Sequence, residues 1–324
     1  PEPTPVPTAI PVPEPTPVPT AIPVPEPTPV PTTIPVPEPT PVPVVIAKYS
    51  FSAESSSTKL TNGLSSKSKK FGISVAIDGD TIITGDSSDS FEGTDSGSAS
   101  VFNISSDTWI QQAQITADDI YQGYLFGGAV DIDGDTAVIG ATGGAKGAVY
   151  VFVLRNGIWA QQEKLVDIAT DSSAQFGKSV AISENTMVVG APTDNAPETS
   201  SGSAFVFTRT DDVWGKVAQL APSGRIYTLK NNRFGESVAI DSERIYVGAQ
   251  GDSSTNGTDS GAVYVFTLSD GSWVEEAKLH ASDGDEGDNF GHSISVFNDT
   301  LVVGAPADDS NGTDSGATYV FVRN

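Results

Sequence analysis

Acidic side chains crowd several loops of this 324-residue chain, and they are its first candidates for chemistry. Carboxylate oxygens are the ligands that calcium prefers, and extracellular modules bind calcium through them at millimolar levels. Calcium is therefore the one cofactor that the sequence suggests, although solvated acidic loops that keep the protein soluble explain the same residues. The candidate ligands are Asp86, Asp89, Asp95, Asp283, Asp285, Asp288, Asp308, Asp309 and Asp314.

Two kinds of residue are candidate attachment points for sugars. Asn-X-Ser/Thr triplets accept N-linked glycans where the producing cell has that machinery. Threonines spaced among prolines are typical of O-glycosylated stalks. The N-glycosylation candidates are Asn103, Asn256, Asn298 and Asn311. The O-glycosylation candidates are Thr4, Thr8, Thr16, Thr20, Thr28, Thr32, Thr33 and Thr40.

Catalytic motifs find little support in the sequence. The chain has no cysteine, which excludes thiol chemistry, and its two histidines are His280 and His292. Neither histidine stands beside a nucleophile elbow or a metal-ligand partner at useful spacing. Paired acids are too abundant for any one pair to indicate a glycosidase. We expect that the chain is not an enzyme.

These residues sit in a pattern that recurs about every fifty residues, which indicates a repeat architecture. Each copy opens on Phe-Gly and continues with two short β-branched runs joined by a turn such as Asp78-Gly79-Asp80, a hairpin signal. A third run ends on Phe, and a fourth carries Trp. Four strands per repeat predict the blade of an all-β propeller. The copies open at Phe71, Phe126, Phe176, Phe234 and Phe290.

Phe-Gly before one strand and Gly-Ala-Pro after the next, as at Gly190-Ala191-Pro192 and Gly304-Ala305-Pro306, resemble the FG-GAP repeats of the integrin alpha-chain propeller. The resemblance covers roughly residues 44–324 and implies five four-stranded blades. That family includes ligand-binding heads, accessory modules of enzymes and microbial surface proteins. Its calcium loops lie between the first two strands of a blade. The corresponding turns here are too short to surround a cation, so that calcium site is not carried over.

Composition divides the chain into a stalk and a body. Nineteen of the 23 prolines fall in residues 1–43, where a twelve-residue unit repeats and favours polyproline II. Residues 44–324 form the predicted propeller. Its last copy ends after three strand-like runs, so we expect residues 44–53 to supply the fourth strand, either to the same ring or to a neighbour's.

Net charge restricts the partners. A formal charge of −24 argues against nucleic acid and against direct binding to anionic lipid, and no apolar run has the roughly twenty residues that span a bilayer. The sequence shows no export signal, which we interpret as lying outside it. We expect a structural glycoprotein of an extracellular surface or appendage, a filament subunit that assembles through stalk-to-head contacts with itself or with other surface glycoproteins. The alternative is a calcium-assisted adhesion or glycan-binding head on an inert spacer.

Overall fold

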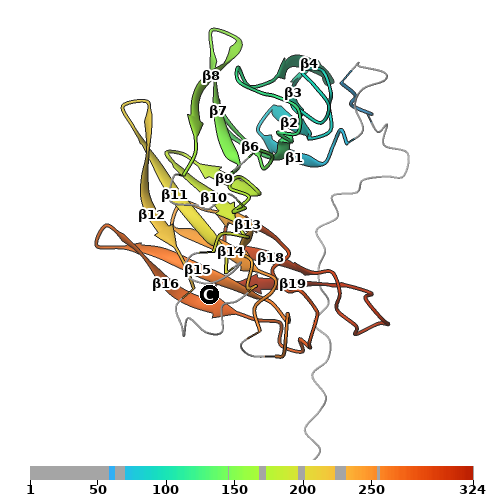
Figure 1. Ribbon diagram of the computed structural model, residues 1–324, viewed down its shortest axis with the longest axis vertical. Coiled ribbons are helices and arrows are strands. Elements are labelled where there is room, and N and C mark those ends of the chain that lie inside the picture. The colour runs from blue at the N-terminus through green and yellow to red at the C-terminus, as the bar shows by residue number, and fades with distance from the viewer. Residues whose placement is uncertain are drawn as a thin grey trace, which may run out of the picture. The chain divides into compact units, whose positions relative to one another are not determined.

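The computed structural model describes residues 58–62, 70–144, 146–167, 173–195, 201–222, 231–253 and 256–323 (Figure 1). The chain divides into two units, Pro1–Ser56 and Ser57–Asn324, and the described residues belong to the second. The expected stalk of residues 1–43 and strand of residues 44–53 lie outside the described residues, so both stay predictions.

Five antiparallel sheets follow one another along the chain, and Figure 1 shows them in sequence from cyan to red. The first consists of β1 (Ser74–Asp78), β2 (Thr81–Asp86), β3 (Ser98–Ser105) and β4 (Thr108–Ile115). The second consists of β5 (Phe126–Asp133), β6 (Thr136–Ala141), β7 (Ala148–Arg155) and β8 (Ile158–Leu165). The third consists of β9 (Ser179–Ser183), β10 (Thr186–Ala191), β11 (Ser203–Thr210) and β12 (Val213–Leu220).

The last two sheets complete the series. The fourth consists of β13 (Phe234–Ile240), β14 (Arg244–Ala249), β15 (Ala262–Ser269) and β16 (Ser272–Leu279). The fifth consists of β17 (Ser293–Phe297), β18 (Thr300–Ala305) and β19 (Ala317–Val322), and is three-stranded among the described residues. Strand order follows chain order within every sheet, which is the meander of a propeller blade. The predicted all-β, five-bladed propeller is confirmed.

Tight turns join the third and fourth strands of each complete sheet. In the second sheet, Asn156 and Gly157 both have positive φ, 53° and 79°, between the paired residues Arg155 and Ile158. Two successive residues with positive φ define a type I′ turn, whose twist matches that of the flanking strands. The same turn recurs at Ser106-Asp107, Asp211-Asp212 and Asp270-Gly271. Short polar residues at these positions therefore fix the hairpins.

The Phe of each Phe-Gly pair is a core residue. Phe176 is fully buried, and its ring meets those of Phe205 and Phe207 on the third strand of its own sheet, with centroids 5.5 and 6.1 Å apart. The same triplet recurs in three other sheets, where Phe126, Phe234 and Phe290 are fully buried between two aromatic rings. Edge-to-face contacts of this kind stabilise beyond the buried area alone.

Glycine is required where consecutive sheets touch. A Cβ on Gly190, at the end of a second strand, would lie 2.1 Å from the carbonyl oxygen of Gly235 in the next sheet. Beside it, Ser179 donates its hydroxyl to the same carbonyl at 2.9 Å. Only glycine permits this approach of two backbones. The two halves of the repeat motif, Gly-Ala and Phe-Gly, therefore meet between sheets. The equivalent close pairs are Gly85 with Gly127, Gly140 with Gly177, and Gly248 with Gly291.

Each junction between sheets also buries aliphatic side chains. In one shared cluster, Val151 on the third strand of the second sheet packs with Val180 and Ile182 on the first strand of the third sheet. Similar clusters join the first sheet to the second, the third to the fourth and the fourth to the fifth. Consecutive sheets are therefore joined by one repeated interface that combines backbone contact with apolar burial.

The two end sheets expose the corresponding side chains. Val320 on β19 is 61% exposed, whereas Val151 and Val206, at the same position in their sheets, are fully buried. On β1, Val75 and Ile77 are 67% and 64% exposed. Among the described residues, the first and last sheets do not share the extensive contacts that join consecutive sheets. An apolar face is thus exposed at each end of the series.

Candidate binding cavity at the junction of the third and fourth sheets

A cavity of about 410 Å³ lies where the β9–β10 and β13–β14 hairpins approach the β15–β16 hairpin. Small-molecule sites commonly enclose about 300 to 1,000 Å³. Its walls include Thr186 at the start of β10, Asp241 and Glu243 in the β13–β14 turn, and Leu268 and Trp273 from the β15–β16 hairpin. The site is therefore formed by three hairpins that the junction holds together.

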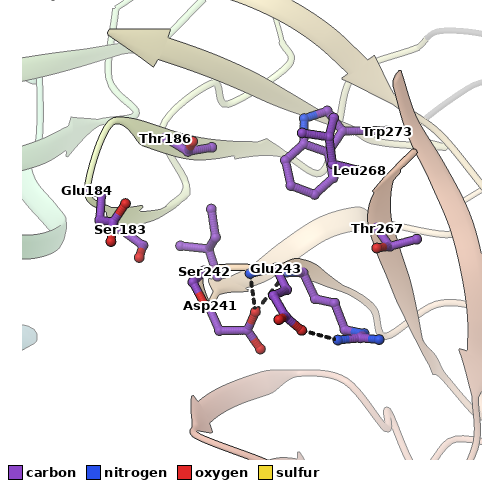
Figure 2. A pocket seen from close by; sticks show the side chains of 11 residues that line it. Ser183, Glu184, Thr186, Asp241, Ser242, Glu243, Thr267, Leu268 and Trp273 are labelled. Atoms are coloured by element: carbon purple, nitrogen blue, oxygen red, sulfur yellow. Dashed lines mark hydrogen bonds and ion pairs between the residues drawn. The ribbon is translucent and has the colours of Figure 1, made fainter. Parts of the chain in front are cut away.

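The side chains surround the cavity from different sides. Figure 2 shows Trp273 and Leu268 together on one side, with Glu184 and Ser183 across from them. Asp241 lies between these two groups in the same view. One wall is thus aromatic and aliphatic, and the others carry carboxylates and hydroxyls. Such a mixture suits a ligand with a flat apolar face and polar edges.

Hydrogen bonds fix the acidic side of the cavity. Asp241 accepts the backbone N–H of Glu243 and of Arg244 at 2.8 and 2.7 Å, and the hydroxyl of Tyr246 at 3.0 Å. Burial, together with the charge of Asp241, raises the pKa of Tyr246 to about 12, so that hydroxyl stays a donor. The carboxylate of Asp241 mainly holds the turn together.

The one arginine in the cavity wall is turned to a carboxylate outside that wall. Arg244 donates from Nε and Nη2 to Glu276 at 2.7 and 3.1 Å, which lowers the pKa of Glu276. Its Nη1 donates to Oε2 of Glu243 at 3.0 Å, and Arg323 donates to the same oxygen at 3.1 Å. Because Oε1 of Glu243 accepts neither bond, the wall retains an excess of acceptors.

Trp273 departs from the expectation that every Trp packs inside a blade. Trp159 and Trp214 are 8% and 4% exposed, whereas Trp109 and Trp273 are only half-buried, and Trp273 lines the cavity. Trp214 is covered by the guanidinium of Arg209, whose centre lies 5.3 Å from the indole. The fourth sheet has Leu268 at that position, opposite Trp273 in the strand pairing. The second sheet also has a leucine there, Leu154 opposite the buried Trp159, so this position alone does not reveal the cavity.

The candidate calcium ligands of the first sheet take part in loop closure. Asp89 is fully buried and accepts the hydroxyl of Ser98 at 2.6 Å and the amide of Gln114 at 3.0 Å. Asp86 is also buried and accepts the backbone N–H of Ser88. Asp95 lies in the same loop with positive φ. These contacts explain the residues structurally, and they leave calcium binding untested.

The remaining candidate ligands gather in two neighbouring loops beside the last sheet. Tyr319 places its hydroxyl 2.9 Å from Asp283 and 2.7 Å from Asp308. Burial raises the pKa of Asp288, and the nearby carboxylates of Asp308 and Asp285 raise it further. The backbone N–H of Asp285 donates to the carboxylate of Asp288, and the backbone N–H of Asp314 donates to that of Asp309. Within the described ranges, no three carboxylate or histidine side chains converge closely enough to hold a metal ion.

The N-glycosylation candidates differ in accessibility. Asn298 lies in the β17–β18 turn and Asn311 in the loop before β19, and both are exposed. Asn103 donates its amide to Thr81 at 2.8 Å, and Asn256 donates its amide to the backbone of the loop after β16. The exposed pair are thus the better acceptors. The O-glycosylation candidates lie outside the described residues.

The fold and its repeated junctions define a β-propeller, and the family that its sequence matches suggests a domain of the adhesion or binding type. Five copies of the FG-GAP repeat model match residues 55–102, 109–152, 159–207, 214–266 and 273–321, and the chain belongs to this family. From the second copy on, each match begins in the fourth strand of one sheet and ends in the third strand of the next. The sequence repeat therefore spans the junction between sheets. Comparison with curated proteins gave no match.

FG-GAP repeats are typical of extracellular proteins. Across the part of the chain that the structure describes, no helix is long and apolar enough to span a lipid bilayer.

Proposed function

We propose that the chain is a structural glycoprotein of an extracellular surface or appendage, and that its copies associate through the end sheets of the propeller. The observation that carries this proposal is the exposure of Val320 in the last sheet and of Val75 and Ile77 in the first. At the internal junctions, side chains at the corresponding positions are buried. The two exposed faces are thus the two halves of the repeated interface.

A second copy is the proposed occupant of each exposed face. Contact between the last sheet of one copy and the first sheet of the next is heterologous, and such contacts build filaments unless they close into a ring. The outer edge of β19 supports the proposal, since its backbone has no strand partner among the described residues and invites pairing with another chain. Contacts of the Pro-rich segment with neighbouring copies would add to this assembly.

Charge substitutions at the two faces test the association. Val320→Lys and Val75→Glu should each abolish assembly in light scattering and electron microscopy, and mixing the two variants should restore mixed pairs. Ile158→Lys is the matched control, because Ile158 is 69% exposed on β8, away from both faces. A wild-type chain that stays monomeric at high concentration, with sugars and divalent ions present, would contradict the proposal.

A second candidate function is an adhesion head on an inert spacer, and the cavity beside Trp273 favours it. Saturable binding of a protein or glycan that survives removal of residues 1–43 would support it. Calcium assistance is tested by thermal unfolding, because a ligand that binds only the folded state raises the melting temperature. Millimolar calcium should raise it more than magnesium does, and equal effects would argue against a specific site.

Two expected absences complete the proposal. We propose no enzymatic activity and no nucleic-acid partner, the second because of the net charge of −24. Both are checked on the purified chain, by screening for hydrolase activity and by measuring nucleic-acid binding at low salt.

A further inference from the structure

The junction of the second and third sheets contains a place equivalent to the cavity, as the strand pairing shows. Arg209 pairs with Trp214 across β11 and β12, and Leu268 pairs with Trp273 across β15 and β16. Each pair faces the preceding sheet. Thr136 begins β6 and Thr186 begins β10, so they are equivalent as well. The junction of the second and third sheets therefore shows what the same geometry holds when it is filled.

At that filled junction, an arginine side chain occupies the space. The guanidinium of Arg209 lies over the indole of Trp214 at 5.3 Å, a cation–π contact. Its Nη1 donates to Oγ1 of Thr136 at 2.8 Å, and its Nε donates to Oδ1 of Asn185 at 2.9 Å. Trp214 is 4% exposed beneath this side chain.

At the junction of the third and fourth sheets, the surroundings remain but the arginine is absent. Leu268 is 56% exposed and has no group that could reach Thr186 as a donor. Trp273 presents an uncovered indole to the cavity. Glu243 directly precedes β14, as Asn185 directly precedes β10, so a carboxylate replaces the amide that accepts from Arg209.

Charge complements this shape. The wall carries Glu184, Asp241 and Glu243 against the cation Arg244, and Arg323 contacts Glu243 from outside the wall. Arg244 directs Nε and Nη2 to Glu276 and Nη1 to one oxygen of Glu243. An incoming cation would find an indole face, a hydroxyl and a free carboxylate oxygen.

We propose that this cavity binds the guanidinium group of an arginine on a partner protein. The planar group would stack on Trp273 and donate to Thr186 and Glu243, as Arg209 does at the neighbouring junction. A lysine ammonium lacks the planar fork and stacks less well. The inference is independent of assembly through the end sheets, since none of these residues belongs to those faces.

Peptide binding to the full chain tests the inference. The probe is a capped Gly-Arg-Gly peptide, with lysine and citrulline versions for comparison, measured by calorimetry or by NMR of the indole N–H. Citrulline keeps the shape of arginine without its charge. We expect a dissociation constant on the order of 1 mM for the arginine peptide. Binding of the other two should be at least about tenfold weaker, as expected when charge-assisted hydrogen bonds are lost.

Two variants sharpen the test. Leu268→Arg fills the cavity from within and should abolish peptide binding, whereas Ile158→Arg adds the same charge on β8 and should leave binding unchanged. Circular dichroism confirms that each variant folds.

Each result decides the matter. No binding by the wild-type chain at millimolar peptide would overturn the proposal, as would equal binding of the citrulline peptide. Unchanged binding by Leu268→Arg would also overturn it, because the peptide would then bind elsewhere.

Discussion

The contact between Gly190 and Gly235 makes a sharp prediction about stability. In Gly190→Ala, the new Cβ would lie 2.1 Å from the carbonyl oxygen of Gly235, a backbone atom that cannot move without moving its sheet. Relief requires the sheets to separate by more than about 1 Å, which disrupts the Ser179–Gly235 hydrogen bond of 2.9 Å. That bond contributes about 1 kcal/mol, and overpacking costs about 1–3 kcal/mol more. We expect a loss of about 2–4 kcal/mol in unfolding free energy.

Gly304→Ala is the matched control. Gly304 holds the same position in the last sheet, and its Cβ would approach only the hydroxyl of Ser293, at 2.4 Å. Gly190 has the same kind of neighbour in Ser179, at 2.2 Å, so the two substitutions differ in the adjoining backbone. A serine hydroxyl can rotate away, and replacing Gly in a strand gains about 0.5–1 kcal/mol. The net effect at Gly304 should stay within about 1 kcal/mol.

Urea and thermal unfolding, followed by circular dichroism at a concentration where the chain is monomeric, measure the difference. For a domain of this size, 1 kcal/mol corresponds to a shift of roughly 2–4 °C, so Gly190→Ala should melt about 4–16 °C lower. Repeat arrays can unfold in several steps, and the midpoint is then compared transition by transition. Equal destabilisation by the two variants in the monomer would refute the reasoning, because it would mean that another sheet covers Gly304.

Two further predictions concern buried charges. Burial raises the pKa of Asp131 to about 6 although its carboxylate accepts the N–H of Ile182 in the next sheet at 2.8 Å. This folded-state pKa exceeds the ordinary value of 3.8, so the folded state favours the protonated form of Asp131. The contribution of Asp131 to stability is therefore full below about pH 4 and is lost as the pH rises through 6. Asp131→Asn should remove up to about 3 kcal/mol of that pH dependence, seen in urea titrations between pH 4 and 7; an unchanged pH profile would contradict the assignment. Lys278→Met should destabilise by about 3 kcal/mol, because Asp252, 2% exposed and 2.9 Å from Nζ, keeps a buried charge. Adding Asp252→Asn should recover part of the loss in the same assay, and full additivity would argue against the pair.

Much of the fold is predictable because the repeat carries local and non-local signals together. Phe-Gly marks both a core ring and the backbone contact between sheets, and short polar pairs such as Asn156-Gly157 fix the hairpins. The register of the strands follows from those turns. Five strand sets of similar length then leave few alternatives to a propeller.

The cavity was not predicted, because it depends on how three hairpins from two sheets meet around Trp273. A Trp in each fourth strand indicates packing, and Trp214 is indeed buried beneath Arg209, as Trp159 is buried opposite Leu154. Leu268 differs from Arg209 in length and charge, and sequence alone does not say that both face the same space. The acidic loops also have a structural role that the sequence does not show, since Asp89 accepts hydrogen bonds inside its own sheet.

The backbone contact between consecutive sheets and the cavity beside Trp273 are linked. When a long side chain is replaced by a short one in a core, the void depends on how far its walls can collapse. At the junctions of this propeller, collapse is resisted because backbone already touches backbone at Gly190 and Gly235, which fixes the spacing of the sheets. The hairpins of the third and fourth sheets are held at that spacing, and a cavity stays open beside Leu268 and Trp273, whereas Trp159 opposite Leu154 is buried. In a repeat of this kind, the side chains around a junction can vary while the backbone contact and the fold stay the same. One of four similar junctions can thereby become a binding site.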